Sequence, residues 1–253
     1  TPVCFGISFA QTALNQASAL VHVYVDGSVS VSTGAVEMGQ SVNTKIQLIA
    51  ARTLGIPPEL VRVDSTNTAR IPNASPTSAS TGADLNGMAT LQACEEILGR
   101  LKGFAARQYG PADPAEVEIR GGQVSVRGQR VDVTWEAFCK AAQFARTDLS
   151  AHSFYATPDL HYDLATERGR PFAYYSYGTS LTEVELDVVR GTYRIVAFDV
   201  VHDIGRTLHE AVDRGQVEGG VVQGMGWATL EQIRYAPDGR VLTGVNAYKI
   251  PDI

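Results

Sequence analysis

The feature that most constrains the fold is a pair of loops rich in small residues, each followed by a helical pattern. The first, residues 34–41, reads Gly-Ala-Val-Glu-Met-Gly-Gln-Ser, and the second, residues 76–84, reads Pro-Thr-Ser-Ala-Ser-Thr-Gly-Ala-Asp. The first turn of a helix has unpaired backbone N–H groups and a partial positive charge, so it favours anionic or polar ligands. Two such loops in one domain predict a single extended ligand, bound largely by backbone and amide groups.

The hydrophobic pattern places strands and helices around these loops. Apolar residues alternate on both sides of an Asp-Gly pair, which predicts a hairpin over residues 18–33. Helical spacing predicts helices over 41–54 and 83–108, and a short strand lies at 60–63. Residues 65–82 form a long loop rich in Ser, Thr, Asn and Pro. A loop of this length inside a compact domain is usually functional.

The remaining segments mix strands and helices without a regular strand–helix–strand rhythm, so we predict an α+β fold rather than a doubly wound sheet. We expect two interpacked lobes, residues 1–132 with both loops and residues 133–253 with a glycine-rich helix. The later elements are, in order, a hairpin over 117–126, a helix over 134–145, a stretch with little regular pattern over 147–172, strands at Thr179–Val189 and Thr192–Val201, the glycine-rich helix over 211–230 and a hairpin at Asp238-Gly239.

The glycine-rich helix is unusual because each glycine lowers helix propensity by roughly 1 kcal/mol. Close packing against backbone or a bulky ligand would explain that composition. Gln216 and Gln223 are two helical turns apart and share one face, where two amides would suit a polar, planar ligand. The alternative is a buried helix whose amides are satisfied by the protein. The glycines are Gly215, Gly219, Gly220, Gly224 and Gly226.

Charge and hydropathy exclude several classes of function. The net charge is −6 and no long basic run occurs, which argues against a nucleic-acid surface. No apolar run reaches the roughly 18 residues of a transmembrane helix, so no membrane span is expected. The first residues lack a signal peptide pattern, and the missing initiator Met indicates a piece of a longer protein.

The cysteines and histidines do not form metal-binding patterns. Cys4, Cys94 and Cys139 are widely spaced and make no Cys-x-x-Cys, which predicts buried structural thiols in a reducing compartment. The five histidines show no His-x-x-x-His spacing, so no protein-ligated metal is expected.

The individual candidate residues are ambiguous when each is taken alone. Met38 and Phe9 are typical of core side chains, and Gln40 is typical of a polar loop residue. The second loop is typical of a capping loop, and it lacks the glycine and lysine pattern of a nucleotide-binding loop. Glu183 and Glu185 lie on one strand face but form no self-sufficient acid–base pair. These residues therefore name no catalytic group by themselves.

Several segments together resemble the molybdopterin-binding domain of the xanthine dehydrogenase and aldehyde oxidase family. They occur in that family's order, with similar spacing, over nearly the whole chain. They are Phe5-Gly6-Ile7-Ser8-Phe9, Leu14-Asn15-Gln16-Ala17, Glu37-Met38-Gly39-Gln40, the run from Pro72 to Ser80, Ala83-Asp84-Leu85-Asn86-Gly87, Tyr177-Gly178, Glu183-Val184-Glu185, the run from Asp213 to Gly219, and Tyr248-Lys249-Ile250-Pro251.

The resemblance implies a cytosolic molybdenum hydroxylase that delivers water-derived oxygen to an electron-poor carbon of a purine, hypoxanthine or xanthine. Electrons then pass through two iron–sulfur clusters to FAD. The resemblance implies that the clusters and FAD lie in other parts of the protein or in partner chains. It also implies that the complete enzyme is a dimer. The implied molybdopterin contacts are Met38, Gln40, Ala79, Ser80, Thr81, Gly82 and Gln216. The implied substrate contacts are Phe9, which holds the flat substrate, and Ser78 and Ala79 beside it.

This sequence departs from the family pattern at two positions. Ala10 stands where xanthine dehydrogenases often have a threonine, and Ser78 stands where alanine is common. The resemblance also places the catalytic glutamate beyond Ile253, so no catalytic residue is expected here and the isolated chain should be inactive. An aldehyde oxidase, another aza-aromatic hydroxylase and a non-catalytic cofactor-binding or assembly module stay open as alternatives. A Gly-Glu-Pro-like motif downstream would indicate an enzyme.

Overall fold

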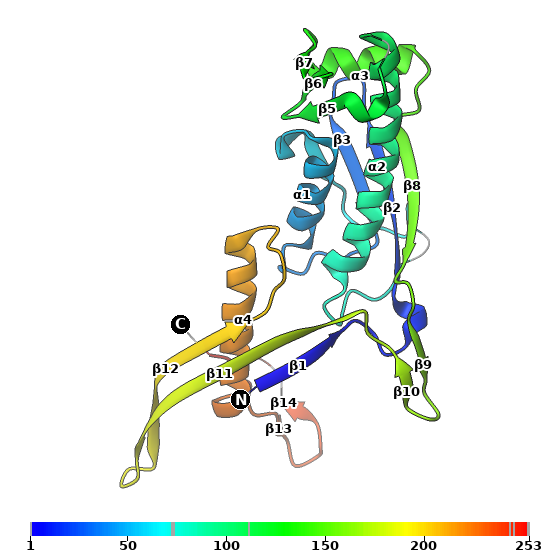
Figure 1. The fold of residues 1–253 in the computed structure, drawn as a ribbon. Helices are drawn as coiled ribbons and strands as arrows, with labels where there is room; N and C mark the ends of the chain where they lie inside the picture. The colour runs from blue at the N-terminus through cyan, green and yellow to red at the C-terminus, as the bar shows by residue number, and fades with distance from the viewer. Residues whose placement is uncertain (1, 72–73, 111, 243, 245, 252–253) are drawn as a thin grey trace. The chain divides into compact units, whose positions relative to one another are not determined.

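Both loops extend from a four-stranded sheet with the strand order β4-β3-β2-β8 (Figure 1). The computed structural model describes residues 2–71, 74–110, 112–242, 244 and 246–251. It divides into two compact units, Thr1–Asp203, which contains this sheet, and Ile204–Ile253. β2 pairs antiparallel with β3 and β8, and β3 pairs parallel with β4. The strands are β2 (Gln16–Val23), β3 (Val29–Thr33), β4 (Val61–Val63) and β8 (Ser150–Ala156).

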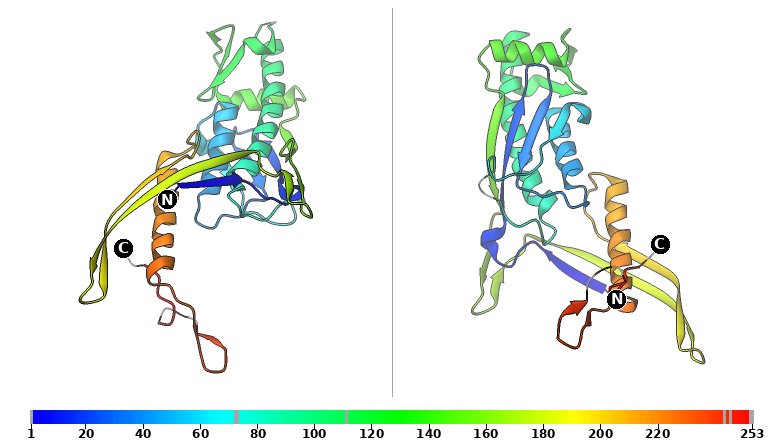
Figure 2. Two further views of the ribbon diagram at one scale, coloured as in Figure 1. Left: turned by 60° about the horizontal axis from the view of Figure 1, so that its bottom comes forward. Right: turned by 180° about the vertical axis from the view of Figure 1, so that it is seen from behind.

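Two helices, α1 (Val42–Leu54) and α2 (Gly82–Gln108), cover one face of this sheet (Figure 2). Alternation along β2 and β3 turns their valines toward the helices, and these valines are buried. Helical spacing does the same on the helices, where Ile46 and Leu54 of α1 and Ile97 and Leu101 of α2 are fully buried. The predicted hairpin, both helices and the short strand are confirmed.

The parallel pair explains why the two loops come together. Because β3 and β4 run in the same direction, their carboxyl ends lie at one edge of the sheet, and the loop after each strand leaves from that edge. Each loop then leads into a helix, so α1 and α2 start close to each other. A methyl group built on Gly82 would lie 3.3 Å from Val42 Cγ2.

A smaller sheet and α3 (Trp135–Phe144) pack at the carboxyl-terminal end of α2. Phe104, Tyr109, Trp135 and Phe138 form an aromatic cluster with ring centroids 5.5–6.2 Å apart. Trp135 Nε1 donates to Gly27 O over 2.8 Å, which ties this region to the β2–β3 turn. The predicted hairpin and helix are confirmed. The strands are β5 (Val117–Arg120), β6 (Gln123–Val126) and β7 (Gln129–Arg130), and the short 3-10 helices of the unit are η1 (Thr12–Leu14), η2 (Pro58–Leu60) and η3 (Pro114–Glu116).

The prediction of little regular structure over residues 147–172 is wrong. β8 pairs with β2 along seven residues, and β9 (His161–Asp163) and β10 (Arg168–Arg170) form a hairpin. β8 lacks a strong apolar signal because its inner positions hold small or polar residues. Ser153 Oγ, for example, donates to Ala89 O of α2.

A second sheet, in the order β1-β11-β12, contains the two longest strands of the chain. β1 (Pro2–Ile7) pairs with the start of β11 (Tyr174–Asp187), and β11 pairs with β12 (Thr192–His202). Cys4 of β1 is exposed, so the prediction of three buried thiols is wrong at this position, because β1 lies in a sheet whose face is open. Cys94 and Cys139 are buried as predicted, and burial raises the pKa of each thiol to about 12.

The second unit is built on the predicted glycine-rich helix, α4 (Glu210–Thr229), and the predicted hairpin of β13 (Arg234–Tyr235) and β14 (Val241–Leu242). Close packing occurs at Gly226, where an added methyl group would lie 2.7 Å from Pro251 Cδ. At the other four glycines of α4, the described residues place no atom within 4 Å of such a methyl group.

Together the two units have mixed helices and strands, so the α+β class is confirmed. The expected division into lobes after residue 132 stays a prediction. Within the described ranges, none of the helices has both the length and the hydropathy needed to span a bilayer.

Candidate functional site

The two loops identified in the sequence contact each other. Val36 N–H donates to Thr77 Oγ1 over 3.0 Å, which joins the first loop to the second. Thr66 Oγ1 lies 2.6 Å from Thr33 O and 2.7 Å from Ala35 O, so the long loop is also held against the end of β3. The loops therefore form one surface at the carboxyl edge of the β3–β4 pair.

Glycine is required at the point where the loops approach most closely. A methyl group built on Gly34 would lie 2.5 Å from Ala74 Cβ, which is closer than real side-chain carbons come. The small residues of this region thus allow two backbones to pass each other, in agreement with the composition of the loops.

The first loop is organised by its own side chains. Glu37 Oε1 accepts hydrogen bonds from Gly39 N–H and Ser41 N–H, both at 2.9 Å, and Glu37 Oε2 accepts one from Asn43 N–H at 3.1 Å. Burial raises the pKa of Glu37, but the backbone donors outweigh it and hold this pKa below the ordinary glutamate value.

The amide of Gln40 closes the same turn. Gln40 Oε1 accepts from Met38 N–H over 2.6 Å, and Gln40 Nε2 donates to Val36 O over 2.8 Å. The sequence interpretation assigned both a donor and an acceptor of Gln40 to a ligand. The structure leaves one N–H of Nε2 and one lone pair of Oε1 for that role, since each group already makes one bond within the loop.

The second loop ends in two consecutive residues with left-handed backbone, Ala79 (φ 53°) and Ser80 (φ 58°). Non-glycine residues rarely adopt this conformation, and it concentrates at functional sites. Thr81 N–H and Oγ1 both bond to Ser78 O, so the side chain of Thr81 does not cap α2. Within the described residues, the N–H groups of the first turn of α2, residues 82–84, bond to no protein group.

The segment that contains Phe9 is fixed by Asn15, which is 2% exposed. Asn15 Oδ1 accepts from Phe9 N–H over 3.0 Å and from Ser8 Oγ, and Asn15 Nδ2 donates to Phe9 O over 2.9 Å. Ser75 Oγ donates to Leu14 O, which links this segment to the long loop over residues 65–82. Phe9 itself is half-buried.

A tyrosine of the second sheet contacts the first turn of α2. Tyr174 OH donates to Asp84 Oδ2. Burial raises the pKa of Asp84, while the Tyr174 hydrogen bond and the charge of Lys45 lower it, and the net shift is upward. Tyr174 lies opposite Ile7 in the β1–β11 pair, so this bond also connects α2 with the strand that leads to Phe9.

All but one of the site residues predicted from the sequence lie in the first unit. The first unit holds the predicted residues of both loops and Phe9. Gln216 is exposed on α4 of the second unit, and its place beside the others stays a prediction. Sequence reasoning did not single out Glu37, Thr77, Asn15 or Tyr174 as organising residues. Glu37, Thr77 and Asn15 stand inside motifs that carried the resemblance, which was the available signal.

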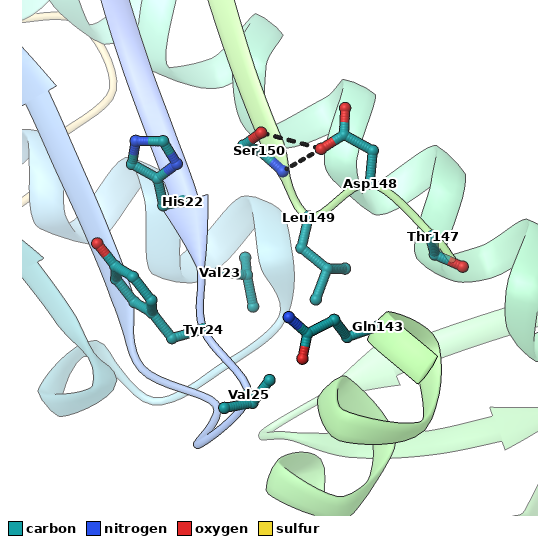
Figure 3. Close-up of a pocket in the computed structure, with 9 residues that line it drawn as sticks. All are labelled: His22, Val23, Tyr24, Val25, Gln143, Thr147, Asp148, Leu149 and Ser150. Carbon is teal, nitrogen blue, oxygen red and sulfur yellow. Dashed lines mark hydrogen bonds between the residues drawn. The ribbon is translucent and has the colours of Figure 1, made fainter. Parts of the chain in front are cut away.

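A pocket of about 360 Å³ elsewhere in the first unit is lined by residues 22–25 and 147–150 with Gln143 (Figure 3). Its carboxylate, Asp148, already accepts from Ser150 N–H and Oγ at 2.9 Å and from Arg100 Nη1 at 3.0 Å. The pocket contains none of the predicted site residues, so the loop surface is the better candidate.

Known proteins resemble this chain along nearly its whole length. The family model described as the molybdopterin cofactor-binding domain matches residues 1–253. The chain belongs to the molybdopterin cofactor-binding domain family. Over 251 residues this domain is 43% identical to the xanthine dehydrogenase/oxidase of Gallus gallus. The matched region covers 99% of this chain and 17% of that protein. The chain thus spans about a sixth of the curated relative's length.

Solved structures show the same fold. Quinoline 2-oxidoreductase from Pseudomonas putida 86 matches the domain with a TM-score of 0.78 and 24% identity, covering 99% of this chain and 32% of that one. The aldehyde oxidoreductase from Desulfovibrio desulfuricans ATCC 27774 matches with a TM-score of 0.66 and 25% identity, covering 89% of this chain and 22% of that one.

The residues of the loop surface fit a molybdopterin cofactor. The start of α2 offers backbone donors that lack a protein acceptor, and Ser80 adds an exposed hydroxyl. A methyl group built on Gly39 would meet no described atom within 4 Å, so the first loop can be approached closely. Such donors suit a polar, anionic cofactor. Among the described residues, no group of three His, Cys, Asp or Glu side chains could hold a metal ion directly.

Proposed function

We propose that this chain is the molybdopterin-binding portion of a cytoplasmic molybdenum hydroxylase that hydroxylates a purine, hypoxanthine or xanthine, with oxygen derived from water. Iron–sulfur clusters and FAD in other parts of the protein or in partner chains would carry the electrons onward, and the complete enzyme would be a dimer. The supporting observation is the 43% identity to the Gallus gallus xanthine dehydrogenase/oxidase over 251 residues, a span that includes both loops.

The first loop contributes side chains to this function. When bound, the cofactor supplies the molybdenum centre at which the substrate carbon gains oxygen. Met38, which is 66% exposed, presents a flexible thioether to the cofactor. Gln40 presents its remaining amide N–H beside it, from a turn that the loop itself holds in place.

The second loop contributes backbone groups. The N–H groups at the start of α2 carry partial positive charge and bind the anionic part of the cofactor. The left-handed backbone at Ala79 and Ser80 turns the chain into this helix, and Thr81 and Gly82 complete the contact. Gln216 of α4 supplies a further amide.

Substrate binding rests on Phe9, Ser78 and Ala79. The backbone of Phe9 is fixed by Asn15, so its ring can serve as a stable stacking surface for a flat heteroaromatic. Ser78 is exposed and Ala79 partly so, and both lie in the loop that Ser75 ties to the Phe9 segment.

A second candidate is an aldehyde or another aza-aromatic heterocycle. Ala10 is exposed and carries no hydroxyl, so it provides no hydrogen bond to a purine edge at that position. A hydrophobic or small substrate would not need one.

Phe9→Ala in the full-length protein separates the two candidates. Loss of stacking, on the order of 1 kcal/mol, should lower kcat/KM for xanthine about fivefold more than for a small aliphatic aldehyde. The measurement is steady-state turnover of both substrates, with molybdenum and pterin content determined for each preparation. Equal losses for both substrates would assign Phe9 to packing. A wild-type protein that binds pterin but turns over neither substrate would indicate the cofactor-binding or assembly module.

A further inference from the structure

We propose that Glu37 is a positioning residue for the molybdopterin site: its carboxylate fixes the Met38-Gly39-Gln40 turn in the shape that presents Met38 and Gln40 to the cofactor. This inference rests on the proposed function and adds to the cofactor contacts a residue that touches none of the cofactor itself.

The exposed carboxylate of Glu37 accepts three backbone hydrogen bonds. Glu37 is the only charged residue between positions 34 and 41. Both of its oxygens accept backbone hydrogen bonds, from Gly39 and Ser41 at Oε1 and from Asn43 at Oε2. Hydrogen bonds to an ionised acceptor are stronger than neutral ones, so these three bonds restrain a loop that has little apolar surface of its own.

These bonds support an uncommon backbone conformation. Gly39 (φ 97°) and Ser41 (φ 61°) both adopt positive φ, and both donate their N–H to Glu37. The serine has no intrinsic preference for this conformation. Without the carboxylate, the turn has fewer interactions that favour it over an ordinary extended path.

Glu37 and Gln40 both stabilise the first loop. Gln40 closes the same turn from the other side through Met38 N–H and Val36 O. The two side chains thus hold adjoining parts of the backbone over residues 36–43, Gln40 at its start and Glu37 at its end. Removal of Glu37 should therefore misplace the amide of Gln40 and the exposed thioether of Met38.

The test is a double-mutant cycle in the full-length protein with Glu37→Ala, Gln40→Ala and the combination. Molybdenum and pterin per polypeptide are measured after identical purification. We expect Glu37→Ala to lower cofactor content about tenfold and Glu37→Gln, which keeps one acceptor, about threefold. The double variant should lose no more than the weaker-binding single variant, because both residues act through one turn.

Two controls separate positioning from folding and from charge. Glu95→Gln removes an exposed carboxylate from α2 and should leave cofactor content unchanged. Ile46→Ala truncates the α1 core and should lower the melting temperature of the cofactor-free protein, whereas Glu37→Ala should lower it much less.

Several results would overturn the inference. They are a cofactor content in Glu37→Ala within twofold of wild type, losses that multiply in the double variant, and a drop in melting temperature for Glu37→Ala equal to that of Ile46→Ala. A wild-type protein without molybdopterin would instead refute the proposed function on which the inference rests.

Discussion

Helices α1 and α2 follow loops of similar composition, yet the chain treats their first turns in opposite ways. At α1, the Glu37 carboxylate accepts the N–H groups of Ser41 and Asn43. At α2, the side chain of Thr81 bonds to Ser78 O instead, and within the described residues the first-turn N–H groups have no protein acceptor. The carboxylate at the start of α1 bonds to backbone N–H groups of that helix start. The carboxylate in the first turn of α2, Asp84, bonds to Tyr174 instead, so the N–H groups there are available for a ligand.

This difference divides the roles of the two loops. At α1, Glu37 would repel an anionic group and its oxygens already occupy N–H groups. At α2, Asp84 accepts from Tyr174, and the N–H groups of the first turn attract an anion. We therefore infer that α2 binds the anionic part of the cofactor and that the α1 loop contributes the neutral groups of Met38 and Gln40. Loop composition alone suggested the same ligand role for both helix starts.

The difference is tested most directly by placing a second carboxylate at the start of α2, in addition to Asp84 of its first turn. Ser80→Asp in the full-length protein should lower molybdopterin content about thirtyfold, since a like charge beside an anionic ligand costs about 2 kcal/mol near a screened surface. Asp tolerates the left-handed backbone of position 80, so the backbone should not change.

Ser80→Asn is the matched control, because asparagine has nearly the same shape and tolerates the same backbone but is neutral. It should keep cofactor content within about twofold of wild type. Pterin and molybdenum per polypeptide measure both variants. Equal losses for the two variants would mean that the hydroxyl of Ser80, rather than the charge at the helix start, decides binding.

The backbone of the second loop offers another test. Ala79→Val places a β-branched side chain at φ 53°, which should destabilise the loop by about 2 kcal/mol. Ala79→Gly should be nearly neutral, because glycine adopts this conformation freely. Hydrogen exchange of residues 82–90 reports the local opening free energy of the first turns of α2. Equal protection in the two variants would contradict a strained conformation at this position.

The bond between Tyr174 and Asp84 should contribute less. Tyr174→Phe removes the donor to a partly buried carboxylate and should lower the opening free energy of the α2 start by about 1 kcal/mol. Tyr175→Phe alters an exposed neighbour and should have little effect. Hydrogen exchange at residues 84–88 measures the opening free energy in both variants. Similar losses in the two variants would show that the bond to Asp84 does not stabilise the start of α2 specifically.

The sequence predicted the elements that carry strong periodicity and left out what depends on tertiary contact. The valines of β2 and β3 and the apolar rows of α1 and α2 gave correct elements because their burial follows from spacing alone. The sequence did not predict β8, because this strand pairs with β2 through backbone bonds while its inner residues are small or polar. The motif residues Met38, Gln40 and Phe9 were found by resemblance, whereas no local pattern shows that the Glu37 carboxylate turns back onto Ser41 and Asn43.

The smallest expected effect concerns the pH dependence of the first helix start. The pKa of Glu37 lies below its ordinary value of 4.5, so the folded loop favours the ionised form. For a lowered carboxyl pKa, the contribution to stability is present above about pH 4.5 and is lost as the pH falls through the lower folded value. Because Glu37 is exposed, this contribution should stay below about 1 kcal/mol. Protection factors of Ser41 and Asn43 N–H between pH 6 and pH 3 should therefore fall in wild type and stay flat in Glu37→Gln, which has no carboxylate to titrate. A parallel fall in both proteins would mean that another group governs the α1 start, and the contrast with α2 would then rest on geometry alone.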